Sequence, residues 1–203
     1  MSYLTSIFLG VSLAAIPGPI FFELIRRTLT KGFWSGALLS VGEFLANLVI
    51  LILTFYGIQQ FLEITWLKAA LFLIGGGLLI YIGLLAFKIT KEDINKSSKN
   101  KNSGKNSIFV GFALAITSPL AIAVWISVGG SYLVQYLSGF VAFSHMIAIA
   151  FGVMLFFFVL ASVVYYIKDK ISAKYIIFVS RIFGIVLIVY GLTAFYKLFE
   201  LLR

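Results

Sequence analysis

The sequence predicts an all-α integral membrane protein with six transmembrane helices, arranged as an inverted-topology 3+3 repeat in which helices one and four are broken. The first observation is composition: the 203 residues are 62% hydrophobic and only 11% charged, with a mean hydropathy of +1.09. A soluble domain carries about 25% charged residues. One span needs about 20 apolar residues, so this length suits roughly six spans in one compact bundle.

Charge-free runs are the second observation, and they place the spans. The long run 106–167 must hold two helices, and it divides at 129–139, a stretch rich in glycine, serine and tyrosine. Residues 1–15 lack the basic start of a signal peptide, so we expect them to be retained in the first span. The six spans are predicted near 3–28, 34–58, 66–88, 108–129, 143–167 and 175–199.

The segment 91–107 divides the chain into two units. It reads KEDINKSSKNKNSGKNS and contains one apolar residue, Ile94, which is typical of a flexible linker in water. We therefore expect a first three-helix repeat over 1–90 and a second over 108–203, together forming one membrane domain.

Basic residues predict the orientation. With six spans, the linkers after spans one, three and five share one side, and that side carries 13 of the 16 Lys and Arg residues. The positive-inside rule makes this side cytoplasmic. We expect a multi-pass protein of the plasma membrane with both termini extracytoplasmic and the 91–107 linker cytoplasmic.

An internal repeat is the third observation. Residues 7–10 (IFLG) are echoed by 108–111 (IFVG), and a proline follows each near mid-helix, at Pro17 and Pro119. The third spans also match, because Gly76 and 83–87 (GLLAF) have the spacing of Gly184 and 191–195 (GLTAF). A three-span unit crosses the membrane an odd number of times, so its copy is inverted, as in many secondary transporters.

The two breaks are the first candidate binding features. Pro17, Gly18 and Pro19 interrupt the first span, and Ser118 with Pro119 interrupts the fourth. Irregular backbone at membrane depth is tolerated where it is buried or lines a cavity. A half-helix that begins at Pro19 would direct free N–H groups at a substrate carboxylate. The alternative is a pair of simple proline kinks.

Glu43 is the second candidate, because a charge at the bilayer centre costs about 2.5 to 3.5 kcal/mol. Asn47 lies four residues on, so both side chains share one helix face. We expect Glu43 to bind a substrate ammonium group or to carry a coupled proton; the alternative is a protonated carboxyl bonded inside the bundle. Glu23 lies within one turn of Arg26 and Arg27, which favours a local ion pair instead.

The sequence lacks the residues that several other functions require. The chain has no cysteine, a single histidine (His145) and no phosphate-binding glycine loop, so we predict no cofactor, no metal site and no ATP-driven step. The net charge of +9 is explained by membrane orientation and does not indicate nucleic acid. The expected partners are a small-molecule substrate, the lipid bilayer and, as a candidate coupling ion, protons; homo-oligomers stay open.

These motifs resemble the lysine-exporter type (LysE/RhtB) amino-acid translocators over nearly the whole chain. The first half carries Gly10-x6-Pro17-Gly18-Pro19, then Arg27, Leu29, Gly32 and Gly36, then Gly42-x3-Ala46-Asn47. The second half carries Gly111-Phe112, Ser118-Pro119-Leu120-Ala121 and Trp125. The resemblance implies six spans with an inverted repeat and the export of amino acids or related metabolites, by exchange with protons.

Two positions depart from the family pattern. The family usually has an acidic residue where this chain has Asn47, and Asn-Pro where it has Ser118-Pro119. Glu43, one turn back, keeps a carboxyl on the same face but displaces it about 6 Å along the axis. The predicted function is a non-enzymatic secondary exporter of small zwitterions working by alternating access. The alternatives are an inorganic cation exporter and a non-transporting membrane scaffold, and a Glu43 that solvent can reach would argue against the scaffold.

Overall fold

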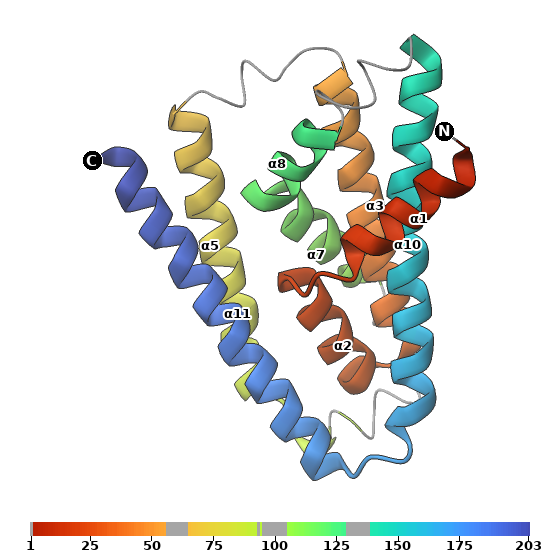
Figure 1. The fold of residues 1–203 in the computed structure, drawn as a ribbon. Helices are drawn as coiled ribbons and strands as arrows, with labels where there is room; N and C mark the ends of the chain where they lie inside the picture. Colours follow the sequence, from red (N-terminus) through yellow and green to blue (C-terminus); the bar gives the residue numbers. More distant parts are fainter. Residues whose placement is uncertain (1, 56–64, 93, 95–104, 129–138) are drawn as a thin grey trace.

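The computed structural model describes residues 2–55, 65–92, 94, 105–128 and 139–203, and the elements in these ranges are helices (Figure 1). This agrees with the predicted all-α class. In chain order the elements are α1 (Tyr3–Ala14), α2 (Pro19–Lys31), α3 (Phe33–Phe55), α5 (Thr65–Phe87), α7 (Lys105–Ile116), α8 (Pro119–Ser127), α10 (Gly139–Lys168) and α11 (Ala173–Leu202).

The first predicted span is broken where the sequence places the prolines. Helices α1 and α2 meet at an angle of 80°. Pro19 occupies the first position of α2, where its missing N–H costs nothing, and Gly18 is the N-cap residue. Helix α2 ends at Gly32, whose φ of 89° is left-handed and favours glycine. The chain then turns directly into α3.

The fourth predicted span is broken in the same way. Helix α7 ends at Ile116, and α8 begins at Pro119 with Ser118 as its N-cap. The predicted linker 91–107 is too long at its C-terminal end, because α7 already begins at Lys105. Ser107 is fully buried and accepts a hydrogen bond from Arg27, which draws the start of α7 into the bundle. Most of the linker lies outside the described residues.

Four helices, α3, α5, α10 and α11, are long and apolar enough to cross a membrane, and the bent pair α1–α2 makes a fifth candidate. Within the described ranges, α7 is a shorter apolar helix. Helix α10 starts at Gly139, four residues before the predicted span 143–167, and the rest of the predicted division at 129–139 lies outside the described residues. The count of six spans stays a prediction.

Glycines bring α1 onto α10 and α3 onto α7. A Cβ atom at Gly10 would collide with the carbonyl group of Ile149, and one at Gly152 would collide with that of Ile7. The second pair repeats this arrangement, since Gly42 meets the carbonyl of Ile108. Gly111 in turn meets Leu39. Small residues that let helix backbones touch are a general means of helix association in membranes.

Helices α5 and α11 pair through the glycines that the sequence repeat singled out. A Cβ at Gly76 would come within 3.1 Å of the Gly191 carbonyl oxygen, and one at Gly191 within 2.8 Å of the Gly76 oxygen. Gly83 and Gly184 show the same reciprocal contact, at 2.7 and 2.8 Å. These four glycines therefore allow the backbones of α5 and α11 to come into close contact.

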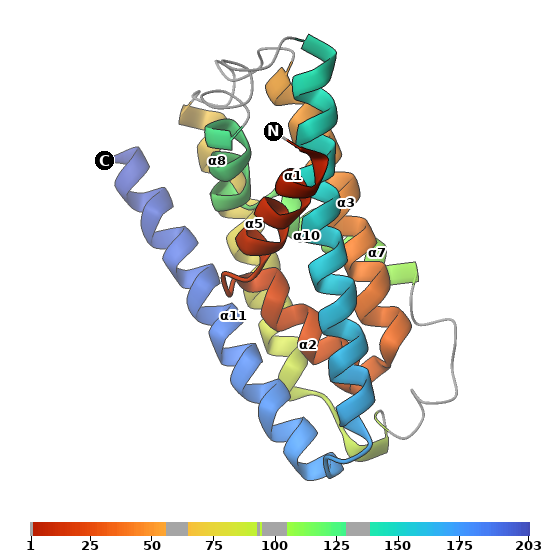
Figure 2. The ribbon, with the colours of Figure 1, turned by 45° about the vertical axis from the view of Figure 1, so that its right-hand side comes forward.

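These pairs assemble into two groups. Helices α5 and α11 run side by side along one flank, while α1, α3, α7 and α10 form the other group (Figures 1 and 2). Helix α2 lies between them and packs against α3, α10 and α11. Both termini lie at the upper end of the molecule in Figure 1, opposite the connection between α10 and α11. The two broken helices thus face each other at the centre.

Candidate functional site

The break between α1 and α2 exposes an uncapped helix start. Gly18 has an extended backbone, with φ of −135° and ψ of −176°, which other residues also adopt, and no side chain caps α2. A Cβ at Gly18 would meet nothing within 4 Å. This backbone conformation does not require glycine. What the glycine provides is open space in front of the first N–H groups of α2.

The break between α7 and α8 has the opposite character. The Ser118 hydroxyl accepts a hydrogen bond from the backbone N–H of Ala121 at 3.3 Å, so α8 carries its own cap. Thr117 donates its hydroxyl proton to the Ala113 carbonyl at 2.6 Å. Of the two facing helix starts, the N-terminus of α2 is the one left without a side-chain cap.

Glu43, Asn47 and Trp125 form a polar cluster beside these breaks. The Trp125 Nε1 donates to Asn47 Oδ1 at 2.9 Å, and the Asn47 amide also interacts with the Glu43 carboxyl. All three residues are buried. Glu43 Oε2 has no hydrogen-bond partner, which is costly for a buried carboxyl oxygen. This oxygen therefore has an unused acceptor position, although neighbouring atoms cover it in this structure.

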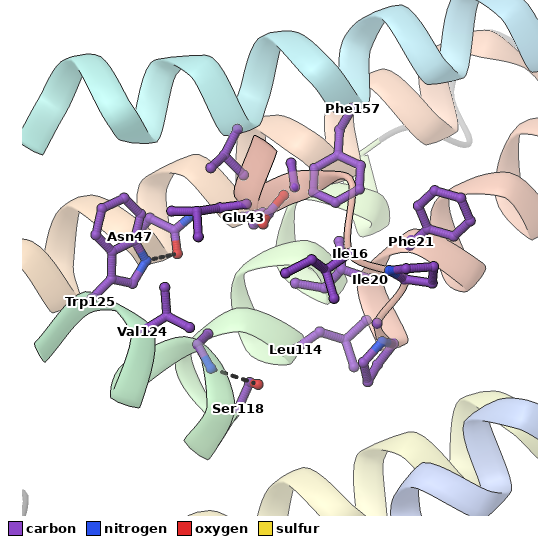
Figure 3. A pocket seen from close by; sticks show the side chains of 17 residues that line it. Ile16, Ile20, Phe21, Glu43, Asn47, Leu114, Ser118, Val124, Trp125 and Phe157 are labelled. Carbon is purple, nitrogen blue, oxygen red and sulfur yellow. Dashed lines mark hydrogen bonds between the residues drawn. The ribbon is translucent and has the colours of Figure 1, made fainter. Parts of the chain in front are cut away.

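These features line one cavity of about 230 Å³ (Figure 3). The structure brings together six of the seven predicted site residues there, and the side chain of the seventh, Pro119, lies outside what it describes. Residues that the site prediction did not include also line the cavity, among them Phe21, Leu114, Trp125, Val153 and Phe157. The six that it shares with the prediction are Pro17, Gly18, Pro19, Glu43, Asn47 and Ser118.

A second cavity of about 350 Å³ lies against the α5–α11 pair. Pro19, Leu114 and Ser118 line both cavities, so the broken helices separate them. On the α11 side, the Tyr190 hydroxyl donates to the Pro17 carbonyl oxygen at 3.3 Å. Lys197 also lines this second space. A contact between α11 and the first break therefore spans the two groups of helices.

Glu23 does not belong to either cavity. Its carboxylate accepts two hydrogen bonds from Arg26, both at 2.7 Å, and one from Arg27 at 2.5 Å. Arg27 also donates to Ser107 on α7 at 2.9 Å. The predicted ion pair is confirmed, and through Arg27 it joins the middle of α2 to the start of α7.

His145 is also structural. It is buried, its Nδ1 lies 2.7 Å from the Ser6 hydroxyl oxygen, and its ring stacks on Tyr3. Within the described ranges, no group of three or more His, Cys, Asp or Glu side chains is arranged to hold a metal ion.

Comparison with known proteins places this architecture in a family. The chain matches the LysE type translocator family over residues 11–198. It belongs to that family. The LysE resemblance read from the proline and glycine motifs is thereby confirmed, and the chain is a membrane exporter, not an enzyme.

Two relatives extend this LysE-type assignment. A Bacillus subtilis (strain 168) protein named "Putative amino acid efflux protein YcgF" is 27% identical over 193 residues, which cover 93% of this chain and 92% of the relative. The Chemotactic transduction protein ChpE of Pseudomonas aeruginosa is 22% identical over 129 residues, or 64% of each chain. No solved structure matches the chain. A small-molecule substrate and a multi-pass location in the cell membrane follow from the family.

Proposed function

We propose that this LysE-type translocator exports amino acids or related small zwitterionic metabolites, and that the 230 Å³ cavity is its substrate site. The observation that carries the proposal is that Glu43, whose buried Oε2 has no partner, lines the same cavity as the uncapped start of α2. A zwitterion satisfies both, with its ammonium group at Glu43 and its carboxylate at the helix N-terminus. The name of the Bacillus relative is consistent with such a substrate.

Each of the proposed site residues has a separate role in binding the substrate. Pro17, Gly18 and Pro19 end α1 and open the start of α2 to the carboxylate. Glu43 binds the ammonium group, and Asn47, held by Trp125, positions Glu43. Ser118 and Pro119 shape the facing break. The cavity is smaller than the roughly 300 Å³ at which sites for drug-sized ligands begin, as expected for an amino acid.

The reciprocal glycine contacts support an inverted 3+3 repeat as the framework of this site. Gly10 and Gly111 are equivalent in the sequence repeat, and each meets a carbonyl of a helix in the other half. The α5–α11 contacts are also unchanged when the two halves are exchanged, because Gly76 and Gly184 swap roles with each other, as do Gly83 and Gly191. Such a two-fold relation suits alternating access, in which the halves rock about the central site.

Protons are the proposed coupling ion, with Glu43 as the carrier. A carboxyl group that binds either a proton or the substrate ammonium exchanges one for the other as the cavity changes sides. We also propose that both termini are extracytoplasmic and the 91–107 linker cytoplasmic, since 13 of 16 basic residues lie on the linker side.

The test is Glu43→Gln in purified protein reconstituted into liposomes. The neutral amide keeps the shape of the side chain but cannot offset the ammonium charge, so we expect amino-acid efflux to fall about tenfold or more. Glu200→Gln, on an exposed position of α11, is the matched control and should export normally. Equal efflux from both variants would remove Glu43 from the site, provided that both run as folded protein in size-exclusion chromatography.

A further inference from the structure

The cavity is lined by polar side chains from α3 and by apolar side chains from α10, the helix that corresponds to α3 in the proposed repeat. Helix α3 meets α7 through Gly42, and α10 meets α1 through Gly152, with the same backbone contact in each case. Glu43 follows Gly42 directly, just as Val153 follows Gly152. The position of Glu43 in one half is therefore that of Val153 in the other.

The next turn of each helix extends this relation. Asn47 lies five residues after Gly42, and Phe157 lies five residues after Gly152. All four side chains line the same cavity, with Glu43 and Asn47 from α3 and Val153 and Phe157 from α10. Figure 3 labels Glu43, Asn47 and Phe157 around this space. The chain has thus placed a carboxyl and an amide at one pair of equivalent positions and two apolar groups at the other.

The remaining lining is apolar as well. Among the described residues that line the cavity, Glu43 is the only ionisable one. Ile20, Phe21, Leu114 and Val124 add apolar surface around it. A second charge on a bound molecule would be buried here without a counter-ion, and such burial costs far more than the apolar contacts return.

We infer that the substrates are amino acids with uncharged, apolar side chains, and that Val153 and Phe157 determine this specificity. The inference rests on the proposed function, in which Glu43 holds the ammonium group and the start of α2 holds the carboxylate. The substrate side chain then packs against Val153 and Phe157. Lysine and arginine are excluded because their second cation has no partner, and aspartate because its second carboxylate faces apolar groups.

Counterflow into liposomes tests the inference. Liposomes that contain the purified protein are preloaded with one unlabelled amino acid, and uptake of labelled leucine is measured. We expect leucine and phenylalanine inside to support uptake at least about tenfold better than lysine or aspartate. Lysine or aspartate as effective as leucine would overturn the specificity but leave the export function intact. No counterflow with any amino acid would overturn the proposed function, and the inference with it.

Two variant pairs locate the specificity. Val153→Glu adds a second carboxyl at the position equivalent to Glu43 and should raise lysine counterflow relative to leucine about tenfold, whereas Val153→Gln should not. Phe157→Asn should favour serine over phenylalanine, while Phe151→Asn, on an exposed position of the same helix, should leave the preference unchanged. An unchanged preference in both Val153→Glu and Phe157→Asn would assign the specificity to other residues and overturn this part of the inference.

Discussion

At the scale of single residues, the buried carboxyl groups of Glu23 and Glu43 differ in whether their oxygens are paired. Both oxygens of Glu23 accept hydrogen bonds from arginines. Glu43 leaves Oε2 without a partner. The sequence already separates these cases, because basic residues lie within one helical turn of Glu23 and none lies within a turn of Glu43.

Other residues of the site could not be predicted singly. Val153 and Phe157 are apolar side chains in an apolar helix, so nothing in their local sequence marks them. Their proposed equivalence to Glu43 and Asn47 becomes visible only when α10 is aligned with α3 through Gly152 and Gly42. The role of Gly18 was also hidden, since a sequence cannot tell whether a glycine serves its backbone angles or the space beside it.

Gly18 and Gly10 make a matched pair of glycine substitutions. Gly18→Leu has room for its side chain and an allowed backbone conformation, so we expect normal thermal stability but a blocked cavity and little efflux. Gly10→Ala forces a methyl group against the Ile149 carbonyl and should cost about 1–3 kcal/mol. Thermal unfolding in detergent and efflux from liposomes separate the two effects. A strongly destabilised Gly18→Leu would show that the space is not available.

Removing the Glu23 carboxylate should damage the fold instead of the site. Glu23→Gln leaves Arg26 and Arg27, which are 2% and 5% exposed, without their shared counter-ion. Breaking a buried pair in this way costs about 3–5 kcal/mol. We expect a marked loss of thermal stability in detergent, with Glu200→Gln as the unaffected control. Stability equal to that of the control would mean that water reaches the arginines.

At the scale of the helices, the sequence predicted both breaks, since proline removes a backbone donor wherever it occurs. It did not predict where α7 begins. The polar composition of residues 105–107 predicts a linker, but α7 already includes them, and Ser107 accepts a hydrogen bond from Arg27. A tertiary contact of this kind leaves no trace in local composition.

Of the two breaks, the one between α7 and α8 has a side-chain cap that can be removed. Ser118→Ala removes the side chain that accepts from Ala121 and should destabilise α8 by about 0.5–2 kcal/mol. Ser118→Thr keeps the hydroxyl and should stay close to the unmodified protein. Thermal unfolding in detergent measures the difference, and equal midpoints for the two variants would argue against Ser118 as the cap.

At the scale of the whole molecule, the sequence repeat matches Gly76 to Gly184 and Gly83 to Gly191, but it does not show which helices these glycines join. The spacing of small residues shows which face of a helix allows close packing, but it does not identify the helix that packs there. Helix α1 packs on α10, and α3 packs on α7, so these small faces join a helix of one half to a helix of the other. The central cavity is therefore lined from both sides of the 91–107 segment, by residues such as Glu43 and Asn47 before it and Trp125 and Phe157 after it.

The orientation of this molecule in the membrane is the remaining prediction, and the absence of cysteine makes it direct to test. Thr65, at the start of α5, and Ser172, before α11, are both exposed. The excess of basic residues places Ser172 in the cytoplasm and Thr65 outside. In intact cells, a membrane-impermeant thiol reagent should label Thr65→Cys but not Ser172→Cys, and permeabilised cells should show labelling of both. The reverse pattern would invert the orientation, and labelling of both in intact cells would contradict the predicted number of crossings between them.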